Sequence, residues 1–593
     1  MVLKRKWTSK ARVLSAMRKT CAGLTGTFLL TCLLMAAAPL KAQDSTNAAP
    51  DITVKAADDS QSVRFALTLK LRNQDELSRE LKSMYNPLNP NYHHFLSASD
   101  FESRFAPSTD DYSALKAFAA KHGLQITREH AGHTMLSVSG SAAAVRDLFK
   151  ANMVWRQTKE GKQYLAADAT PTAPSDLSSL GGGVVGLNQT PLRPSVVPTH
   201  HSANSKPSAG SGPYGLYTPS DIRTAYNLNS IENGGEPVAL VEFSGANYSD
   251  AAVYASNYNL PNPTLTQIAV DGGNTDTTNA VEVMLDIEMV MAISSPSNIY
   301  VYTAPNSFGD GLDMLLQIAE DDHVGQVSTS WGLCEQEITQ EAASDENEIL
   351  TQMAAEGIAL FAATGDYGYN GCGGMAEGVS DPASQPYATG VGATTLTTSS
   401  SQGYSGESVW YDADTSPYPS GSGGGISEYW PIPDYQAGVK AVSSQFSKTM
   451  RNVPDVTADG DPDTGFYIYC SQCTADGGAG WGGWGGTSAA APQWAAVWSL
   501  ISKALSHTTE VRVGFANPAL YSIGESSLGY ANAMHDVTTG NNGYYNAVTG
   551  YDNASGWGSY NGAGLLQQVS AWKKKRVSIT PVIRYILSHD QAG

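Results

Sequence analysis

The sequence predicts an α/β protein whose main domain contains a mainly parallel β-sheet and is preceded by a smaller α+β module. The chain has 593 residues, which exceeds the usual length of one domain. After residue 214, short apolar runs alternate with helical patterns, as in proteins with helices on both faces of a parallel sheet. A stretch rich in Pro, Ser, Gly, Asn and His separates this region from an earlier alternating one. We therefore expect two domains joined by a solvated linker.

The smaller module extends over residues 63–153 and mixes strand-like with helix-like segments. These segments cover residues 63–71, 75–85, 110–122, 135–139 and 142–150. Between Pro171 and Pro213 the apolar patterns give way to the linker composition. Such a solvated segment is a favourable place for proteolytic cleavage, and the domain boundary is placed there.

Five buried strands and three helices define the main domain. The expected strands cover residues 238–243, 299–304, 326–330, 358–363 and 389–395, and the helices cover residues 279–292, 312–321 and 341–356. In an α/β domain of this kind, the ligand site lies at the carboxyl ends of the strands.

The amino terminus resembles an export signal. Residues 1–42 contain eight Lys or Arg and no Asp or Glu. Within this segment, an apolar run extends from Leu24 to Ala38, and a small-residue site follows at Ala42. A membrane anchor is the alternative, but the run is short for a span and is ended by Pro39. No later stretch looks transmembrane, so we expect no stable membrane insertion. Residues 573–593 form a basic tail for which the sequence suggests no role.

Charge and cysteine content fit an exported protein that does not bind nucleic acid. Cleavage of the signal would lower the formal charge from −20 to about −28, which disfavours nucleic acids and anionic membranes as partners. Four cysteines would remain, an even number suited to two disulfides: Cys334, Cys372, Cys470 and Cys473. The last two form a CxxC pair, for which redox or zinc chemistry is the alternative interpretation.

Ser488 is the candidate nucleophile. It follows a Gly-Gly-Thr turn and precedes apolar residues at helical spacing, so it would lie in the first helical turn with the helix dipole behind it. Gly/Ser/Thr clusters are also common in ordinary loops. A serine nucleophile needs a base, yet His323, His507 and His535 are the only histidines in the main domain, and none lies in a recognisable catalytic motif.

Two carboxylates offer a different base. Glu282 and Asp286 are four residues apart in an otherwise apolar helical segment, so both lie on one helical face. Buried together, they should titrate as a coupled pair in which one holds a proton. An ordinary solvated i,i+4 pair is the alternative.

In combination, these motifs resemble the sedolisin family of serine-carboxyl peptidases, secreted acid proteases with a subtilisin-like fold. The resemblance covers the chain from the export signal to Trp572 and includes the Glu-x-x-x-Asp helix, the Gly-Thr-Ser motif and a Gly-Asp turn at Asp366. It implies that Glu282 is the general base, that Asp286 orients it and that Ser488 is the nucleophile. Asp366, protonated, would stabilise the oxyanion. Glu242 and Trp331 match positions that extend the acid network in some members. An acidic optimum, at roughly pH 3 to 5, is expected.

The resemblance also implies a calcium site near the end of the main domain. The ligands would be two carboxylates and three backbone carbonyls, from Asp536, Val537, Val548, Gly550 and Asp552. Hard oxygen donors are what Ca²⁺ prefers. Val548 replaces a glycine of the family pattern, but only its carbonyl would be used. From spacing alone, a glycine-rich turn is an equal alternative.

The resemblance further implies the domain plan. Residues 1–42 would be the signal peptide, 50–190 an inhibitory prodomain with a ferredoxin-like fold, 191–213 the processing linker and 214–572 the catalytic domain. Cys334 would pair with Cys372, and Cys470 with Cys473. We expect a monomer, secreted outside the cell or exported to the cell envelope, that is inhibited by its own prodomain and acts on polypeptides. A histidine-based subtilisin-like protease, or an inactive binding protein on the same fold, are the alternatives.

Overall fold

A computed structural model describes residues 52–159, 161–198, 210–373, 376–415, 418–473, 480–509 and 512–571, with residues 507–509 described only as backbone. The expected signal peptide, the basic tail and residues 199–209 of the expected linker lie outside the described residues. Among the described helices, none combines the length and the apolar character needed to cross a membrane.

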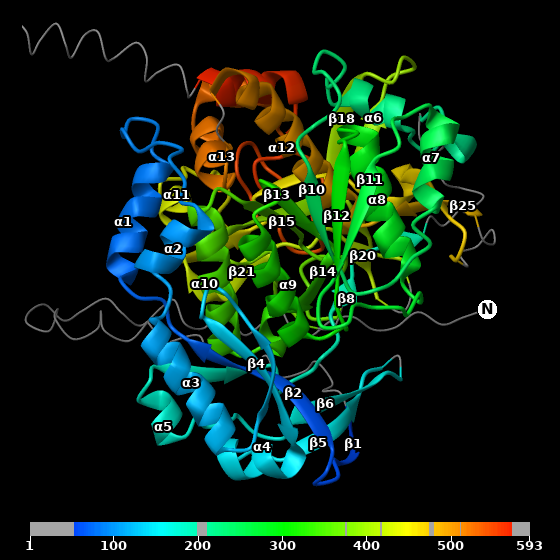
Figure 1. Cartoon of the computed structure of the whole chain (residues 1–593). Helices are drawn as coiled ribbons and strands as arrows, with labels where there is room; N and C mark the ends of the chain where they lie inside the picture. The colour runs from blue at the N-terminus through cyan, green and yellow to red at the C-terminus, as the bar shows by residue number, and fades with distance from the viewer. Residues whose placement is uncertain are drawn as a thin grey trace, which may run out of the picture. The chain divides into compact units, whose positions relative to one another are not determined.

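The amino-terminal module, blue and cyan in Figure 1, contains a three-stranded antiparallel sheet, β1-β5-β6, and a four-stranded antiparallel sheet covered by helices on one face. Its strands are β1 (Ile52–Ala56), β2 (Ser62–Leu69), β3 (Gln125–Glu129), β4 (Met135–Ser141), β5 (Met153–Gln157), β6 (Gln163–Ala167) and β7 (Gly182–Val185). Its helices are α1 (Gln74–Met84), α2 (Ala98–Arg104), α3 (Thr109–Lys121), α4 (Ala142–Phe149) and α5 (Ser175–Ser178). The four-stranded sheet has the order β3-β4-β2-β7, which with α3 and α4 is the ferredoxin-like arrangement expected from the resemblance.

Alternating side chains explain why α3 and α4 cover one face of this sheet. On β2, Val63, Phe65 and Leu67 are buried in one apolar core together with Leu115 of α3 and Val145 of α4. Because successive side chains of a strand point to opposite faces, these three residues share the helix-covered face.

The main domain contains the predicted parallel sheet. Its strand order is β11-β12-β10-β13-β15-β17-β18, with β23 also paired to β17, and only β18 is antiparallel to its neighbour. The bounds are β10 (Val238–Glu242), β11 (Thr264–Ala269), β12 (Asn298–Thr303), β13 (Gln326–Thr329), β15 (Ala359–Ala363), β17 (Ala388–Thr398), β18 (Tyr404–Val409) and β23 (Val456–Asp459). The five strands predicted from apolar runs are therefore confirmed within two residues, except that β17 extends three residues further.

Helices cover both faces of this sheet. They are α6 (Pro219–Ala225), α7 (Asp250–Tyr258), α8 (Ala280–Ile293), α9 (Phe308–Asp321), α10 (Gln340–Ala355), α11 (Asp434–Ala437), α12 (Thr487–Thr509), α13 (Asn517–Gly524) and α14 (Ser527–Ala533). Val238 and Leu240 of β10 pack in the core of α8 and α12, whereas Ala239 and Val241 pack in the core of α9. At these four positions β10 is thus apolar on both faces, as is typical of a strand in a parallel sheet between helices.

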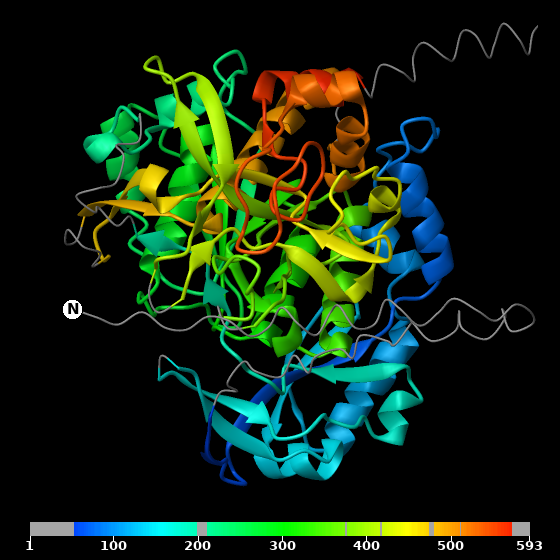
Figure 2. The same cartoon turned by 180° about the vertical axis from the view of Figure 1, so that it is seen from behind.

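Short strands complete the main domain. They are β14 (Trp331–Cys334), β16 (Ser380–Asp381), β19 (Tyr411–Asp412), β20 (Ser420–Gly421), β21 (Gly425–Pro431), β22 (Met450–Val453), β24 (Phe466–Cys470), β25 (Gly480–Gly485), β26 (Met534–His535) and β27 (Ser559–Tyr560), with 3-10 turns at Pro213–Gly215, Glu335–Glu337 and Pro462–Thr464. In Figure 2 the red loops that follow α14 lie against the yellow strand β21, and Asn553 donates to the Gly425 carbonyl there.

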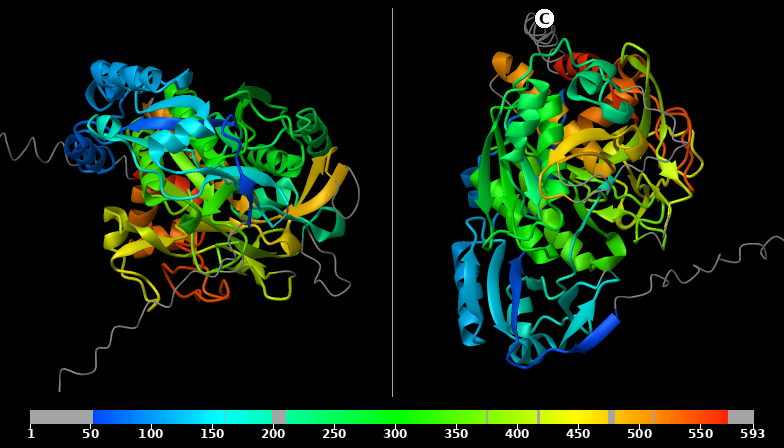
Figure 3. Two further views of the ribbon diagram at one scale, coloured as in Figure 1. Left: turned by 90° about the horizontal axis from the view of Figure 1, so that it is seen from below. Right: turned by 90° about the vertical axis from the view of Figure 1, so that its right-hand side faces the viewer.

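The ferredoxin-like module contacts the α9 and α10 side of the main domain through opposite charges. Arg64 of β2 donates to Asp310 at 2.5 Å, and Lys70 donates to Asp345 at 2.6 Å. His130 lies 2.7 Å from Asp313 and is fully buried. Both views of Figure 3 show the blue and cyan sheet beside the green helices. The contact is therefore basic on the module side and acidic on the main-domain side.

Candidate active site

Ser488 lies at the amino-terminal end of α12, where its sequence motif predicted it. The backbone of Gly486 has a φ of 111°, a conformation that favours glycine, and the helix begins at the next residue. Ser488 is fully buried, and its hydroxyl has no hydrogen-bond partner of standard geometry. Its backbone N–H donates to the carbonyl oxygen of Ser195 at 3.0 Å. The nucleophile candidate is thus in contact with a peptide carbonyl of the chain itself.

Glu282 and Asp286 both lie on the buried face of α8, which packs against α12. Both side chains are fully buried, so the solvated-pair alternative is wrong. Ser330 donates its hydroxyl to Asp286 at 2.8 and 3.0 Å. Neither carboxylate oxygen of Glu282 has a partner of standard geometry, although the Ser488 hydroxyl is close enough to lower the pKa of Glu282. Glu282 is therefore the acid available to Ser488.

Glu242 and Trp331 extend this acid pair, as the resemblance implied. Glu242 is the last residue of β10, and Trp331 follows β13, so both lie at carboxyl ends of sheet strands. The Trp331 indole Nε1–H donates to Glu242 Oε2 at 2.9 Å in a fully buried contact. Burial raises the pKa of Glu242, and repulsion from the neighbouring Asp286 carboxylate raises it further. The network thus connects Glu242, Asp286 and Glu282.

Asp366 follows β15 and faces the start of α12. Its Oδ1 accepts from the Thr487 N–H and from the Thr487 hydroxyl, each at 2.8 Å. Its Oδ2 is buried without a partner. Burial raises the pKa of Asp366 to about 7, so this group keeps a proton in acid. A protonated Oδ2 would be a hydrogen-bond donor.

Burial is the main cause of the raised pKa values in this cluster. Desolvation raises the pKa of Glu242, Glu282, Asp286 and Asp366, and mutual repulsion raises those of Glu242 and Glu282 further. None of these four carboxyls forms an ion pair with any Lys, Arg or His in the described part of the chain. The cluster can therefore hold several carboxylic acids and little negative charge.

No histidine side chain in the described part of the chain contacts Ser488. His323 stacks on Tyr300, and His535 stacks on Tyr404 with ring centres 3.7 Å apart. The side chain of His507 lies outside the described atoms. The acid pair on α8, rather than an imidazole, faces the nucleophile.

A segment of the expected linker crosses this site. β8 (Arg193–Pro194) pairs antiparallel with β14, and β9 (Val197–Pro198) pairs antiparallel with β25. Ser195, between them, donates its N–H to the Ser330 carbonyl at 3.0 Å. Ser195 and Ser330 were not predicted from the sequence. Ser330 could have been found, since it follows a predicted strand and precedes Trp331.

Both predicted disulfides are present, Cys334–Cys372 and Cys470–Cys473. The first joins the end of β14 to the loop after Asp366. It therefore connects two segments that border the site.

The predicted calcium ligands lie in two facing loops. Gly550 donates its N–H to Asp536 at 3.1 Å, and Val548 donates its N–H to Asp552 at 2.7 Å. The Val537 carbonyl accepts from the Ser555 hydroxyl at 3.4 Å. Among the described residues there is no group of three His, Cys, Asp or Glu side chains suited to a metal, so an ion here would need carbonyl ligands. Two acids beside loop carbonyls form a hard oxygen donor set, which suits Ca²⁺.

Comparisons with known proteins agree with this geometry. The model described as "Pro-kumamolisin, activation domain" matches residues 52–190, and that of the subtilase family matches residues 297–558. Kumamolisin from Bacillus sp. (strain MN-32) is 29% identical over 85% of this chain and 91% of its own. Sedolisin from Pseudomonas sp. (strain 101) is 29% identical over 87% and 88%. A solved structure of Pseudomonas sedolisin with pseudo-iodotyrostatin superimposes with a TM-score of 0.54 and 27% identity, covering 60% of this chain and 99% of that one. The chain therefore combines a pro-kumamolisin-type activation domain with a subtilase-type domain, and it is similar to the serine-carboxyl peptidases kumamolisin and sedolisin over most of its length.

Proposed function

We propose that this peptidase is an acid-active endopeptidase, made as a zymogen, in which Ser488 attacks the peptide carbonyl. One observation carries the proposal: Glu282, Asp286 and Asp366 converge on the start of α12 beside Ser488, without a cation or an imidazole among their described contacts. A hydroxyl needs a proton acceptor, and Glu282 is the acid of this cluster whose two carboxylate oxygens both lack a standard partner.

Glu282, when ionised, accepts the Ser488 proton as Oγ bonds to the carbonyl carbon. Asp286 would orient Glu282 during the reaction, and it is itself held by the Ser330 hydroxyl. Glu242 and the Trp331 indole hold the far end of the network. Glu282 then returns the proton to the leaving amine, and water hydrolyses the acyl-enzyme by the same steps in reverse.

Asp366 supplies the hydrogen bond to the developing oxyanion, together with the Ser488 N–H. Such a donor contributes about 3 to 4 kcal/mol in comparable sites. With a pKa of about 7, Asp366 loses its proton as the pH rises through neutrality, and the donor becomes a repelling charge. In strong acid, Glu282 is protonated and cannot act as a base. The upper pH limit of activity should therefore lie near neutrality, and the resemblance places the optimum at roughly pH 3 to 5.

Export, inhibition by the prodomain and self-cleavage complete the proposed function. Residues 1–42 direct export and are removed, and residues 50–190 inhibit the enzyme until the linker at 191–213 is cleaved by the enzyme itself. The segment 193–198 supports both inhibition and an endopeptidase activity, since chain continues on either side of the site. Polypeptides are the substrates.

Calcium, bound by the carboxylates of Asp536 and Asp552 and the carbonyls of Val537, Val548 and Gly550, would join the two loops and stabilise the folded protein. A ligand present at 100 times its dissociation constant stabilises by about 2.7 kcal/mol. The melting temperature of the Ser488→Ala protein should therefore fall on addition of a chelator and recover with Ca²⁺ but not with Mg²⁺. An unchanged melting temperature in chelator would count against the site.

The proposed function is tested by bringing the purified proprotein and its Ser488→Ala variant to pH 4 and following intact mass and casein cleavage. The wild type should lose the prodomain and cleave casein, with activity vanishing near pH 7, whereas Ser488→Ala stays intact. The variant should remain folded, because the Ser488 hydroxyl has no standard hydrogen bond to lose. Equal cleavage by both proteins would refute the role of Ser488.

A further inference from the structure

The segment 192–198 lies in the active site in the manner of a substrate. Arg193 and Pro194 pair antiparallel with Gly332 and Trp331 on one side of Ser488. Val197 and Pro198 pair antiparallel with Gly485 and Trp484 on the other side. One extended strand thus enters beside β14 and leaves beside β25, and Ser195 and Val196 are the residues at the crossing.

The Ser195 carbonyl occupies the position of an attacked carbonyl. Its oxygen accepts from the Ser488 N–H at 3.0 Å, and the Ser195 N–H is held by the Ser330 carbonyl. A Cβ atom added to Gly486 would clash with the Ser195 carbonyl oxygen and would lie 2.7 Å from Asp366 Oδ2. The unpartnered Asp366 Oδ2 and the Ser195 oxygen therefore border the same small space, where an oxyanion would form.

Arg193, two residues before Ser195, binds a side chain of the main domain. Its guanidinium donates to both carboxylate oxygens of Glu337 at 2.6 and 2.7 Å, a bidentate contact. Glu337 also accepts from the Cys334 N–H at 3.1 Å, which fixes its carboxylate beside β14. One residue further back, the backbone of Leu192 is held on both sides by the Asn306 amide.

We propose that Ser195–Val196 is the first bond that the enzyme cleaves in its own chain, and that Glu337 selects a basic side chain two residues before the attacked carbonyl, in the linker and in peptide substrates. The inference rests on the proposed function and names its first substrate and one determinant of specificity. Arg193 fills the selected position in the linker.

The chemistry of this cleavage balances within the site. Ser488 Oγ gives its proton to Glu282 and bonds to the Ser195 carbonyl carbon. The C–N bond to Val196 then breaks, and the Val196 nitrogen takes the proton from Glu282 and leaves as an amine. Water next adds to the Ser195 carbonyl carbon and gives one proton to Glu282. The bond from that carbon to Ser488 Oγ then breaks, and Oγ takes the proton from Glu282. The products are a prodomain that ends at Ser195 and a fragment that begins at Val196.

The bond is identified by acidifying the full-length proprotein, stopping the reaction at early times, and determining the new amino terminus and both masses. The earliest fragment should begin at Val196. Fragments that begin first at any other residue, from a protein that does cleave, would overturn the assignment of the bond while leaving the proposed function intact.

The role of Glu337 is tested on the processed enzyme with two quenched peptides, one containing Leu-Arg-Pro-Ser-Val-Val-Pro and the other with Ala in place of Arg. At pH 5, kcat/KM should favour the Arg peptide by about 3- to 10-fold, chiefly through KM, and Glu337→Gln should remove the preference. Equal rates on the two peptides would overturn this role.

Exchanging the charges of Arg193 and Glu337 distinguishes an effect on recognition of the linker from an effect on folding. Arg193→Glu should slow the first cleavage by about the same 3- to 10-fold factor, and Glu337→Arg combined with Arg193→Glu should restore it. A double variant that is slower than both single variants would contradict direct recognition. A wild-type protein that cleaves neither its linker nor either peptide in acid would refute the proposed function itself.

Discussion

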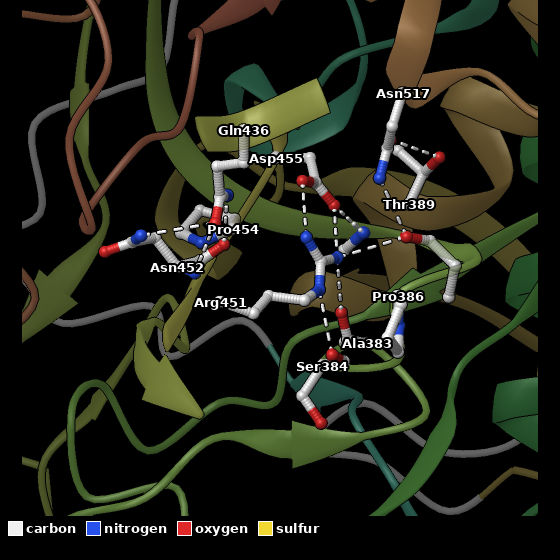
Figure 4. A network of polar contacts seen from close by, with 12 residues as sticks. Ala383, Ser384, Pro386, Thr389, Gln436, Arg451, Asn452, Pro454, Asp455 and Asn517 are labelled. Atoms are coloured by element: carbon white, nitrogen blue, oxygen red, sulfur yellow. Dashed lines mark hydrogen bonds and ion pairs between the residues drawn. The ribbon is translucent and has the colours of Figure 1, made fainter. Parts of the chain in front are cut away.

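Two buried clusters of ionisable side chains in the main domain avoid the free-energy cost of burying an unpaired charge, and they do so in opposite ways. Around Ser488, four carboxyls are buried without a cation among their described contacts. Between β22 and β23, Asp455 is buried against Arg451, whose guanidinium donates to both of its oxygens at 3.0 and 2.7 Å (Figure 4). The first cluster avoids charge by raised pKa values, and the second retains charge by pairing it.

The hydrogen bonds around each cluster follow from this difference. Arg451 also donates to the Ser384 carbonyl, and Asp455 also accepts from the Tyr521 hydroxyl and the Gly390 N–H. By contrast, both oxygens of Glu282 and one oxygen of Asp366 have no standard partner. A saturated cluster can only stabilise the fold, whereas unpartnered acids are free to exchange protons with a substrate. The comparison therefore assigns stability to one cluster and chemistry to the other.

The largest expected effect concerns the chemical cluster. Glu282→Gln should slow self-cleavage at pH 4 by about 10³- to 10⁴-fold, because an amide cannot accept the Ser488 proton. Glu288→Gln is the matched control: Glu288 is buried on the same helix, and its replacement can still accept the Tyr469 N–H through the amide oxygen. The control should cleave within about threefold of wild type, as followed by intact mass. Comparable losses in both variants would mean that burial on α8, rather than proton transfer, controls the rate.

Breaking the paired cluster should cost folding free energy instead. Arg451→Met leaves Asp455 buried without its cation and should lower the free energy of unfolding by about 3 to 5 kcal/mol. The measurement is urea unfolding in the Ser488→Ala background, which prevents self-cleavage. Adding Asp455→Asn should recover part of the loss, since the uncompensated charge is then removed. A double variant whose loss equals the sum of the two single losses would show that the pair is not coupled.

The next effect is a dependence of stability on pH. The pKa of Asp366 is about 7 in the folded protein and 3.8 for the ordinary group, so between these values the folded state holds a proton that the unfolded state has released. The free energy of unfolding contributed by Asp366 therefore falls as the pH rises from about 4 to 7. The difference corresponds to at most about 4 kcal/mol.

Urea unfolding of Ser488→Ala at pH 4 and pH 7 measures this dependence, and Ser488→Ala/Asp366→Asn is its control. Asparagine keeps the acceptor for Thr487 but cannot ionise, so the variant should lose less stability between pH 4 and pH 7. Identical pH dependence in the two proteins would place the titration elsewhere.

Local sequence patterns predicted the segments of the fold but not the contacts between distant ones. Apolar runs located β10, β12, β13, β15 and β17, and the Glu-x-x-x-Asp spacing placed both acids on one face of α8. The start of α9 was predicted four residues too late, although Ser307, which accepts from the Asp310 N–H, is a typical helix cap.

Local sequence patterns could not predict the contacts of Ser195 and Arg193. Ser195 meets Ser488 across 293 positions of the chain, and Arg193 meets Glu337 across 144. No periodicity within either segment encodes such a pairing, because it depends on how the linker crosses the finished site. The resemblance identified the candidate catalytic residues, but these contacts depend on the structure of this chain.

The smallest expected effect concerns Trp331, whose indole donates a hydrogen bond to the outer end of the acid network. Trp331→Phe removes the Nε1–H bond to Glu242, a buried bond worth about 1 kcal/mol, so self-cleavage should slow by about fivefold. Burial raises the pKa of Glu242 and this bond partly offsets the rise, so without the bond Glu242 keeps its proton to higher pH. Less negative charge then faces Asp286, so the curve of rate against pH should change shape as well as height. A uniform decrease at every pH would instead indicate lost packing against Phe243, which contacts the Trp331 ring.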